Sequence, residues 1–129
     1  MSERNPTIVV VEDEKLLLEA IIKKLEISGI SAIGCSNVNE AIVYLDKTSV
    51  PPDAIWLDYY LQDTSGFDFL MELKGNPQWA NIPVIIVSNS ESQEAIKKMI
   101  ALGAYKYIVK TDFRLDEIVN MFKELIHQK

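Results

Sequence analysis

The sequence predicts an α/β fold: a doubly wound, five-stranded parallel sheet with helices on both faces, built as (βα)₅. Short apolar runs rich in β-branched residues alternate with stretches in which apolar residues recur every three or four positions. Strands that alternate with helices pair in parallel through right-handed crossovers. Because the first, third and fourth apolar runs are the strongest, we expect them in the middle, which gives the strand order 2-1-3-4-5.

The strands differ in how apolar they are. Three runs are apolar on both faces, as expected of buried central strands: residues 8–11, 55–57 and 84–87. Two weaker runs, residues 31–35 and 105–109, are interrupted by a glycine and a lysine. We therefore expect these two at the edges of the sheet.

Amphipathic helices are expected after each strand. The first ends before Gly29, and the second begins with Asn37 and Glu40, which form a capping-box pattern. The third covers about residues 67–74, and the fourth ends at Gly103, a residue type that favours a helix C-cap. The last helix lies close to the C-terminus, so we expect one domain spanning residues 1–129.

Composition excludes several classes of protein. The chain has 129 residues and a net charge of −6, which argues against nucleic acid or a membrane surface as the main partner. One Cys cannot form an internal disulfide, and one Cys with one His cannot build a Cys/His zinc site. We find no signal peptide or membrane-spanning run and expect a cytoplasmic protein.

Polar residues follow the predicted strands at one edge of the sheet. Glu12 and Asp13 follow the first strand, Asp58 the third, Ser88 the fourth and Lys110 the fifth. Clustered carboxylates indicate a site for Mg²⁺, and the metal with the lysine and the hydroxyl suits phosphoryl transfer, in which an Asp can be the nucleophile. Taken singly, each residue has an ordinary structural explanation, such as a helix N-cap or a solvated lysine.

Motifs in a fixed order cover nearly the whole chain. Val-Glu-Asp-Glu lies at 11–14, Gly66 lies eight residues after Asp58, and Ser88 lies thirty residues after it. Gly-Ala at 103–104 is followed by Tyr-Ile-Val-Lys at 107–110. Together these motifs resemble the response-regulator receiver domain of the CheY-like type.

The resemblance implies a metal-dependent phosphoacceptor. Asp58 would take a phosphoryl group from the phosphohistidine of a sensor histidine kinase or a phosphotransfer protein. Mg²⁺ (or Mn²⁺) would be held by Asp13, Asp58 and the backbone carbonyl of Tyr60, with Glu12 acting through water. The domain would assist its own phosphorylation and dephosphorylation without being a conventional enzyme.

The resemblance also implies a switch. Ser88 and Lys110 would hold the phosphoryl oxygens, and movement of Ser88 would let Tyr107 turn inward. This would reshape the face made by the fourth helix, fifth strand and fifth helix, which would contact a downstream protein as a monomer or a phosphorylation-dependent dimer.

Three positions depart from the family pattern. Gln62 and Thr111 stand where the family often has proline, and Asn89 stands where it has a smaller residue. The proline after the lysine is typically cis in the family, and a cis Lys-Thr bond would cost about 3–4 kcal/mol. We therefore expect a strained loop or a trans bond with a displaced Lys110.

Four further residues carry smaller predictions. Tyr59 and Tyr60 are bulky enough to shield an aspartyl phosphate from water, which predicts slow dephosphorylation. Cys35 is expected to be apolar filling, and Trp56 faces the same side of its strand as Asp58.

Three other functions compete with the phosphorelay. A receiver-like domain could act as a phosphorylation-independent interaction module, as Thr111 and Asn89 suggest. An aspartyl-phosphate phosphatase needs a second acid where Tyr60 stands, and a flavodoxin-type cofactor site would be repelled by the acidic loop at 12–14.

Overall fold

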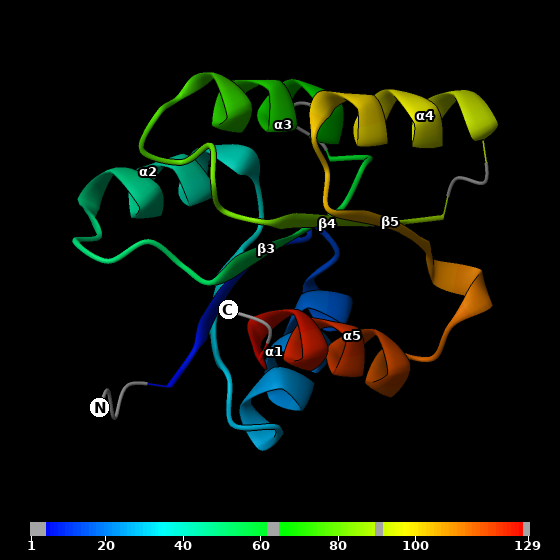
Figure 1. Ribbon diagram of the computed structural model, residues 1–129. Coiled ribbons are helices and arrows are strands. Elements are labelled where there is room, and N and C mark those ends of the chain that lie inside the picture. Colours follow the sequence, from blue (N-terminus) through cyan, green and yellow to red (C-terminus); the bar gives the residue numbers. More distant parts are fainter. Residues whose placement is uncertain (1–4, 62–64, 90–91, 128–129) are drawn as a thin grey trace.

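The computed structural model describes residues 5–61, 65–89 and 92–127 and confirms the predicted fold class and strand order (Figure 1). A parallel sheet has the order β2-β1-β3-β4-β5. Its strands are β1 (Thr7–Val11), β2 (Ser31–Cys35), β3 (Ala54–Leu57), β4 (Val84–Ser88) and β5 (Lys106–Val109). The two weaker runs form the edge strands, as expected.

Helices cover both faces of the sheet (Figure 1). One face carries α1 and α5, and the other carries α2, α3 and α4. Their bounds are α1 (Lys15–Ile27), α2 (Val38–Lys47), α3 (Gly66–Gly75), α4 (Gln93–Leu102) and α5 (Leu115–His127). Within the described residues, no helix combines the length and the apolar character needed to cross a membrane.

The core is divided by the sheet into two layers. In β1, Val9 packs toward α2 and α3, whereas Ile8 and Val10 pack toward α1 and α5. Residues of a strand point alternately to its two faces, so a central strand covered on both sides must be apolar throughout. On the α5 side, Trp56 stacks on Phe122 with ring centroids 5.0 Å apart.

The helix-end signals have the expected structural roles. The Asn37 side chain accepts a hydrogen bond from the Glu40 N–H at 2.8 Å. The Glu40 carboxylate accepts from the Ser36 N–H, one residue earlier than in the standard capping box. Gly103 ends α4 with φ of 118°, a conformation that favours glycine.

Some boundaries differ from the sequence prediction. β5 begins at Lys106, one residue later than expected, and α3 includes a glycine at each end. The described residues contain no cis peptide bond, so the bond between Lys110 and Thr111 is trans. Lys110–Asp112 forms a short 3₁₀ turn, and Gln62 lies outside the described residues.

Candidate functional site

The acidic edge begins where β1 ends. The Glu12 N–H donates to the Cys35 carbonyl at 3.0 Å, which continues the pairing of β1 with β2 by one residue. Glu12 is 2% exposed, and its carboxylate also accepts from the Glu14 N–H at 3.0 Å. A buried carboxylate held in this way needs a nearby positive charge.

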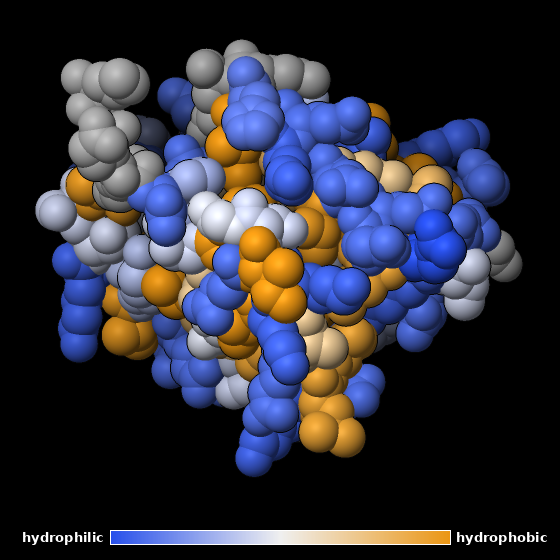
Figure 2. All heavy atoms as spheres, turned by 90° about the horizontal axis from the view of Figure 1, so that it is seen from below, coloured by the Kyte–Doolittle hydropathy of each residue, from blue (hydrophilic) through white to orange (hydrophobic). Residues whose placement is uncertain are grey.

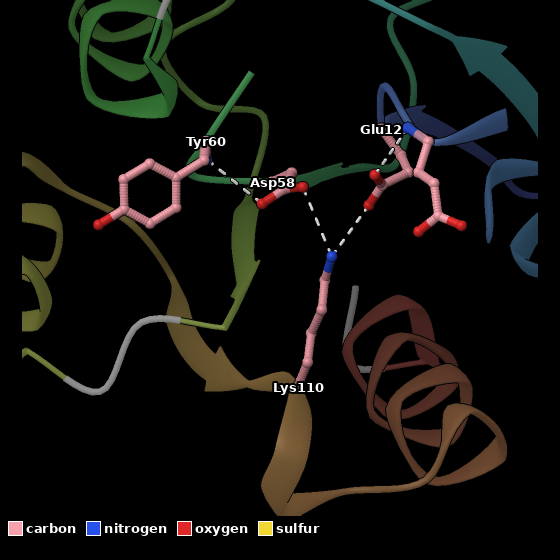
Figure 3. A network of polar contacts seen from close by, with 5 residues as sticks. Glu12, Asp58, Tyr60 and Lys110 are labelled. Carbon is pink, nitrogen blue, oxygen red and sulfur yellow. Dashed lines mark hydrogen bonds and ion pairs between the residues drawn. The ribbon is translucent and has the colours of Figure 1, made fainter. Parts of the chain in front are cut away.

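Asp58 follows β3 in the same manner. Its N–H donates to the Val11 carbonyl at 3.1 Å, so the residue is held by the sheet and not by a free loop. Its carboxylate accepts a hydrogen bond from the Tyr60 N–H at 3.3 Å (Figure 3). Asp58 therefore occupies a fixed position at the end of a central strand, 7% exposed.

Lys110 supplies the positive charge. Its ammonium group lies 3.1 Å from a Glu12 oxygen and 3.4 Å from an Asp58 oxygen, between the two carboxylates (Figure 3). The lysine follows β5 and reaches both acids although the bond after it is trans. Threonine at position 111, in place of the proline that the resemblance leads one to expect, therefore does not keep the Lys110 ammonium group away from the acidic edge.

The charges perturb one another's protonation. The pKa of Asp58 is raised to about 6: burial is the main cause and the Glu12 carboxylate adds to it, while Lys110 and the Tyr60 N–H act in the opposite direction. Burial lowers the pKa of Lys110, but the carboxylates of Asp58 and Glu12 outweigh burial, so its pKa stands above the ordinary value. Lys110 therefore stays charged and one ammonium serves two buried acids.

The carboxylates are arranged to hold a cation. One oxygen from each of Glu12, Asp13 and Asp58 lies within 4.8 Å of the others. Hard oxygen donors of this kind suit Mg²⁺, and three carboxylates against one ammonium leave an excess of negative charge for a divalent ion to balance. The residues present therefore fit the metal predicted from the sequence. Participation of the Tyr60 carbonyl stays a prediction.

The loop after Asp58 is held closely against α3. The Gly66 N–H donates to the Tyr59 carbonyl at 2.7 Å, and Tyr60 forms an antiparallel bridge with Ser65. A Cβ atom on Gly66 would lie 2.7 Å from the Asp58 carbonyl oxygen, so only glycine fits without a shift of the backbone. The glycine at this spacing thus allows α3 to begin against the acceptor loop.

The two tyrosines beside Asp58 are placed differently. Tyr59 is half-buried, whereas Tyr60 is 60% exposed and its ring extends away from the Asp58 carboxylate (Figure 3). Shielding of an aspartyl phosphate would therefore depend mainly on Tyr59. Slow dephosphorylation stays a prediction.

The predicted switch residues lie on neighbouring strands. Ser88 ends β4 and is fully buried, while Tyr107 in β5 is half-buried and packs against the core layer of α2, α3 and α4. The register pairs Ile86 with Tyr107 and Ser88 with Val109, so Ser88 and Tyr107 are two positions apart and share a face of the sheet. Asn89 is exposed.

Sequence reasoning missed the pairing of Glu12 with Lys110, having placed Glu12 only near the metal. A signal was present, because a carboxylate predicted to follow a buried strand directly needs a cation.

Cys35 is buried, and burial raises its thiol pKa to about 12, which makes it unreactive and fits its expected role as apolar filling.

Comparisons with known proteins agree on one family. The family model described as "Response regulator receiver domain" matches residues 8–123. The two-component response regulator ORR8 of Oryza sativa is 31% identical over 106 residues, which is 82% of this chain and 87% of that protein. A Francisella response regulator receiver domain has a TM-score of 0.85 at 27% identity, covering 96% of this chain and 98% of the other. The phosphorylated cyanobacterial phytochrome response regulator RcpA has a TM-score of 0.80 at 26% identity, covering 95% and 91%.

Proposed function

Because the chain belongs to the response regulator receiver domain family, we propose that it is the phosphoacceptor of a two-component phosphorelay, phosphorylated on Asp58. The observation that carries the proposal is the meeting of Glu12, Asp13, Asp58 and Lys110 at one sheet edge. The Asp58 carboxylate is fixed by the backbone, borders a cation site and contacts an ammonium group, which are the parts that phosphoryl transfer needs.

The chemistry is an in-line displacement at phosphorus. An Asp58 carboxylate oxygen attacks the phosphoryl group of a phosphohistidine on a kinase or phosphotransfer protein. The new P–O bond forms as the P–N bond breaks, and its electron pair returns to the imidazole nitrogen. Asp13 and Asp58, with Glu12 nearby, would hold Mg²⁺, which would supply positive charge beside the phosphoryl oxygens.

The lysine and serine act on the product. Lys110 can exchange part of its contact with Asp58 for a phosphoryl oxygen while keeping Glu12, since an ammonium group has three donors. Ser88, at the end of β4, would donate to another oxygen. The aspartyl phosphate carries about two negative charges where the ionised Asp58 carboxylate carried one, and this added charge would bias a two-state equilibrium.

The output is protein contact. We assign it to the face of α4, β5 and α5, reached from Ser88 through Tyr107. Ile100 on α4 and Tyr105 just before β5 are 46% and 48% exposed, which supports docking of a protein there. A cytoplasmic location and the absence of conventional enzyme activity belong to the same proposal.

The test is formation of the acyl phosphate. The protein is incubated with acetyl phosphate and Mg²⁺, and its intact mass is measured. We expect a phosphoryl adduct in the wild type and none in Asp58→Asn. Asp46→Asn, the same substitution at an exposed position of α2, is the matched control and should still be modified.

Two results would redirect the proposal. An adduct that survives Asp58→Asn would move the acceptor to another residue. If neither acetyl phosphate nor beryllofluoride changes the wild type in the presence of Mg²⁺, the phosphorylation-independent interaction module becomes the better assignment.

A further inference from the structure

A pocket of about 340 Å³ lies at the opposite end of the sheet from the acidic edge. Two connections form it, one leading from α2 into β3 and the other from α3 into β4. Both lie on the left of Figure 1, whereas the turn of Lys110–Asp112 (orange) lies on the right. The lining residues are Leu45, Thr48, Ser49, Pro51, Gln78 and Trp79. Pockets that hold small organic molecules begin at about 300 Å³, so this pocket is large enough for one.

The walls of the pocket are held in place by the protein's own hydrogen bonds. On the first connection, the Thr48 hydroxyl donates to the Val50 carbonyl at 2.8 Å. On the second, the Trp79 N–H donates to the Asn76 carbonyl at 2.9 Å, and the Gln78 N–H donates to the Asn76 side chain at 2.9 Å. The pocket is therefore formed before a ligand arrives, as is usual for small-molecule sites.

The floor of the pocket is apolar and aromatic. Leu45 and Trp79 are 4% and 6% exposed, and both belong to the core layer on the α2 and α3 side of the sheet. Pro51 adds an exposed hydrocarbon ring. A flat ring compound packs well on such a surface, because apolar and aromatic groups gain free energy when they leave water.

The rim of the pocket is polar and uncharged. Ser49 and Gln78 are exposed. A ligand that touches Ser49 meets either its hydroxyl or its peptide group, both of which form hydrogen bonds, and the flexible Gln78 side chain can turn its carboxamide toward a ligand. None of the six lining residues is charged, in contrast to the α1 and α5 side, where hydrophilic side chains surround the apolar ones (Figure 2). A charged ligand would lose water and find no counter-ion in the lining.

We propose that this pocket binds a small, uncharged, flat ring compound that carries an amide group. The ring packs on Leu45 and Trp79, and the amide, which both donates and accepts, pairs with the carboxamide of Gln78. A sugar fits less well, because it presents hydroxyl groups all round its ring while the Thr48 hydroxyl is already bonded to Val50. The pocket lies at the other end of β3 from Asp58 and does not depend on the proposed phosphotransfer.

The test compares benzamide with benzoate and toluene in unmodified protein without Mg²⁺. Benzoate has nearly the shape of benzamide but is an anion, and toluene lacks the amide. In the ¹⁵N-labelled protein, benzamide should shift the Trp79 indole and Gln78 side-chain resonances with one dissociation constant, and should bind more tightly than benzoate or toluene by about threefold or more. The Trp56 indole is the internal control, because it lies in the other core layer, across the sheet.

One substitution and its matched control sharpen the test. Gln78→Ala removes an exposed carboxamide from the pocket and should weaken benzamide binding relative to toluene by about three- to tenfold. Gln93→Ala, at an exposed position at the start of α4, should leave this ratio unchanged. The assignment would be overturned by a Trp79 indole that moves no more than that of Trp56, by benzoate binding as tightly as benzamide, or by an unchanged ratio in Gln78→Ala.

Discussion

Replacing Asp58 with asparagine should stabilise the metal-free protein at neutral pH. Burial is the main reason that the pKa of Asp58 is raised from 3.8 to about 6, and Glu12 adds to it. At pH 7 the folded state must therefore hold an ionised carboxylate in an unfavourable place, only partly offset by Lys110. Asparagine has nearly the same shape and carries no charge.

The sign and size follow from proton linkage. Between about pH 4 and pH 6 the folded state keeps a proton on Asp58 that the unfolded chain has lost, so the free energy of unfolding falls as pH rises. Each unit of pKa shift corresponds to about 1.4 kcal/mol. Above about pH 6, ionised Asp58 therefore lowers the free energy of unfolding by at most about 3 kcal/mol. Since the side chain is 10% exposed, solvent screening is small, and we expect about 2 kcal/mol.

Urea unfolding in a chelator measures this effect. Wild type, Asp58→Asn and the exposed control Asp46→Asn are compared at about pH 4.5 and about pH 7.5. The free energy of unfolding of Asp58→Asn should exceed that of the wild type by less than about 1 kcal/mol at the lower pH and by about 2 kcal/mol at the higher pH. A wild type that is as stable as Asp58→Asn at the higher pH would refute the reasoning.

Three further predictions concern the same edge. Saturating Mg²⁺ should stabilise the wild type in thermal unfolding by about 2–3 kcal/mol at a hundred times its dissociation constant, and should stabilise Asp58→Asn much less; equal stabilisation would place the ion elsewhere. Gly66→Ala should destabilise the fold by about 1–3 kcal/mol through contact with the Asp58 backbone. Gly75→Ala, at the other end of α3 with nothing within 4 Å, should be neutral or stabilising by up to about 1 kcal/mol, and urea midpoints that rank the two the other way would contradict this. Lys110→Met should lower the free energy of unfolding by about 2 kcal/mol or more near pH 7.5, because Glu12 and Asp58 lose their cation. The loss should be smaller near pH 4.5, where Asp58 takes up a proton. An equal loss at both pH values, measured by urea unfolding, would count against the ion pairs.

Local patterns were enough to predict the sheet. The β-branched runs of β1, β3 and β4 are buried on both faces, and this burial is what their composition requires. The order of the strands followed from which runs were weakest. The helix ends at Asn37 and Gly103 are likewise set by nearest neighbours in the chain.

The direction of side chains could not be read in the same way. Sequence position placed Glu12 and Lys110 at one edge, but their pairing depends on how far the lysine reaches across the ends of β4 and β3. For Thr111 the sequence left a strained loop or a trans bond as alternatives, and the structure has the trans bond with the Lys110 ammonium group in contact with both carboxylates. Among the described residues the buried Trp56 N–H has no acceptor, which is a result of tertiary packing that leaves no trace in composition.

The contact between Glu12 and Lys110 joins residues 98 positions apart. Closing a loop of this length costs conformational entropy, which the rest of the fold must offset. A chain that ends before β5 contains Glu12, Asp13 and Asp58 but lacks the lysine that contacts Glu12 and Asp58. In the proposed function, competence for phosphotransfer would then arise only when the last strand is in place, and an incomplete chain would not draw phosphoryl groups from a kinase.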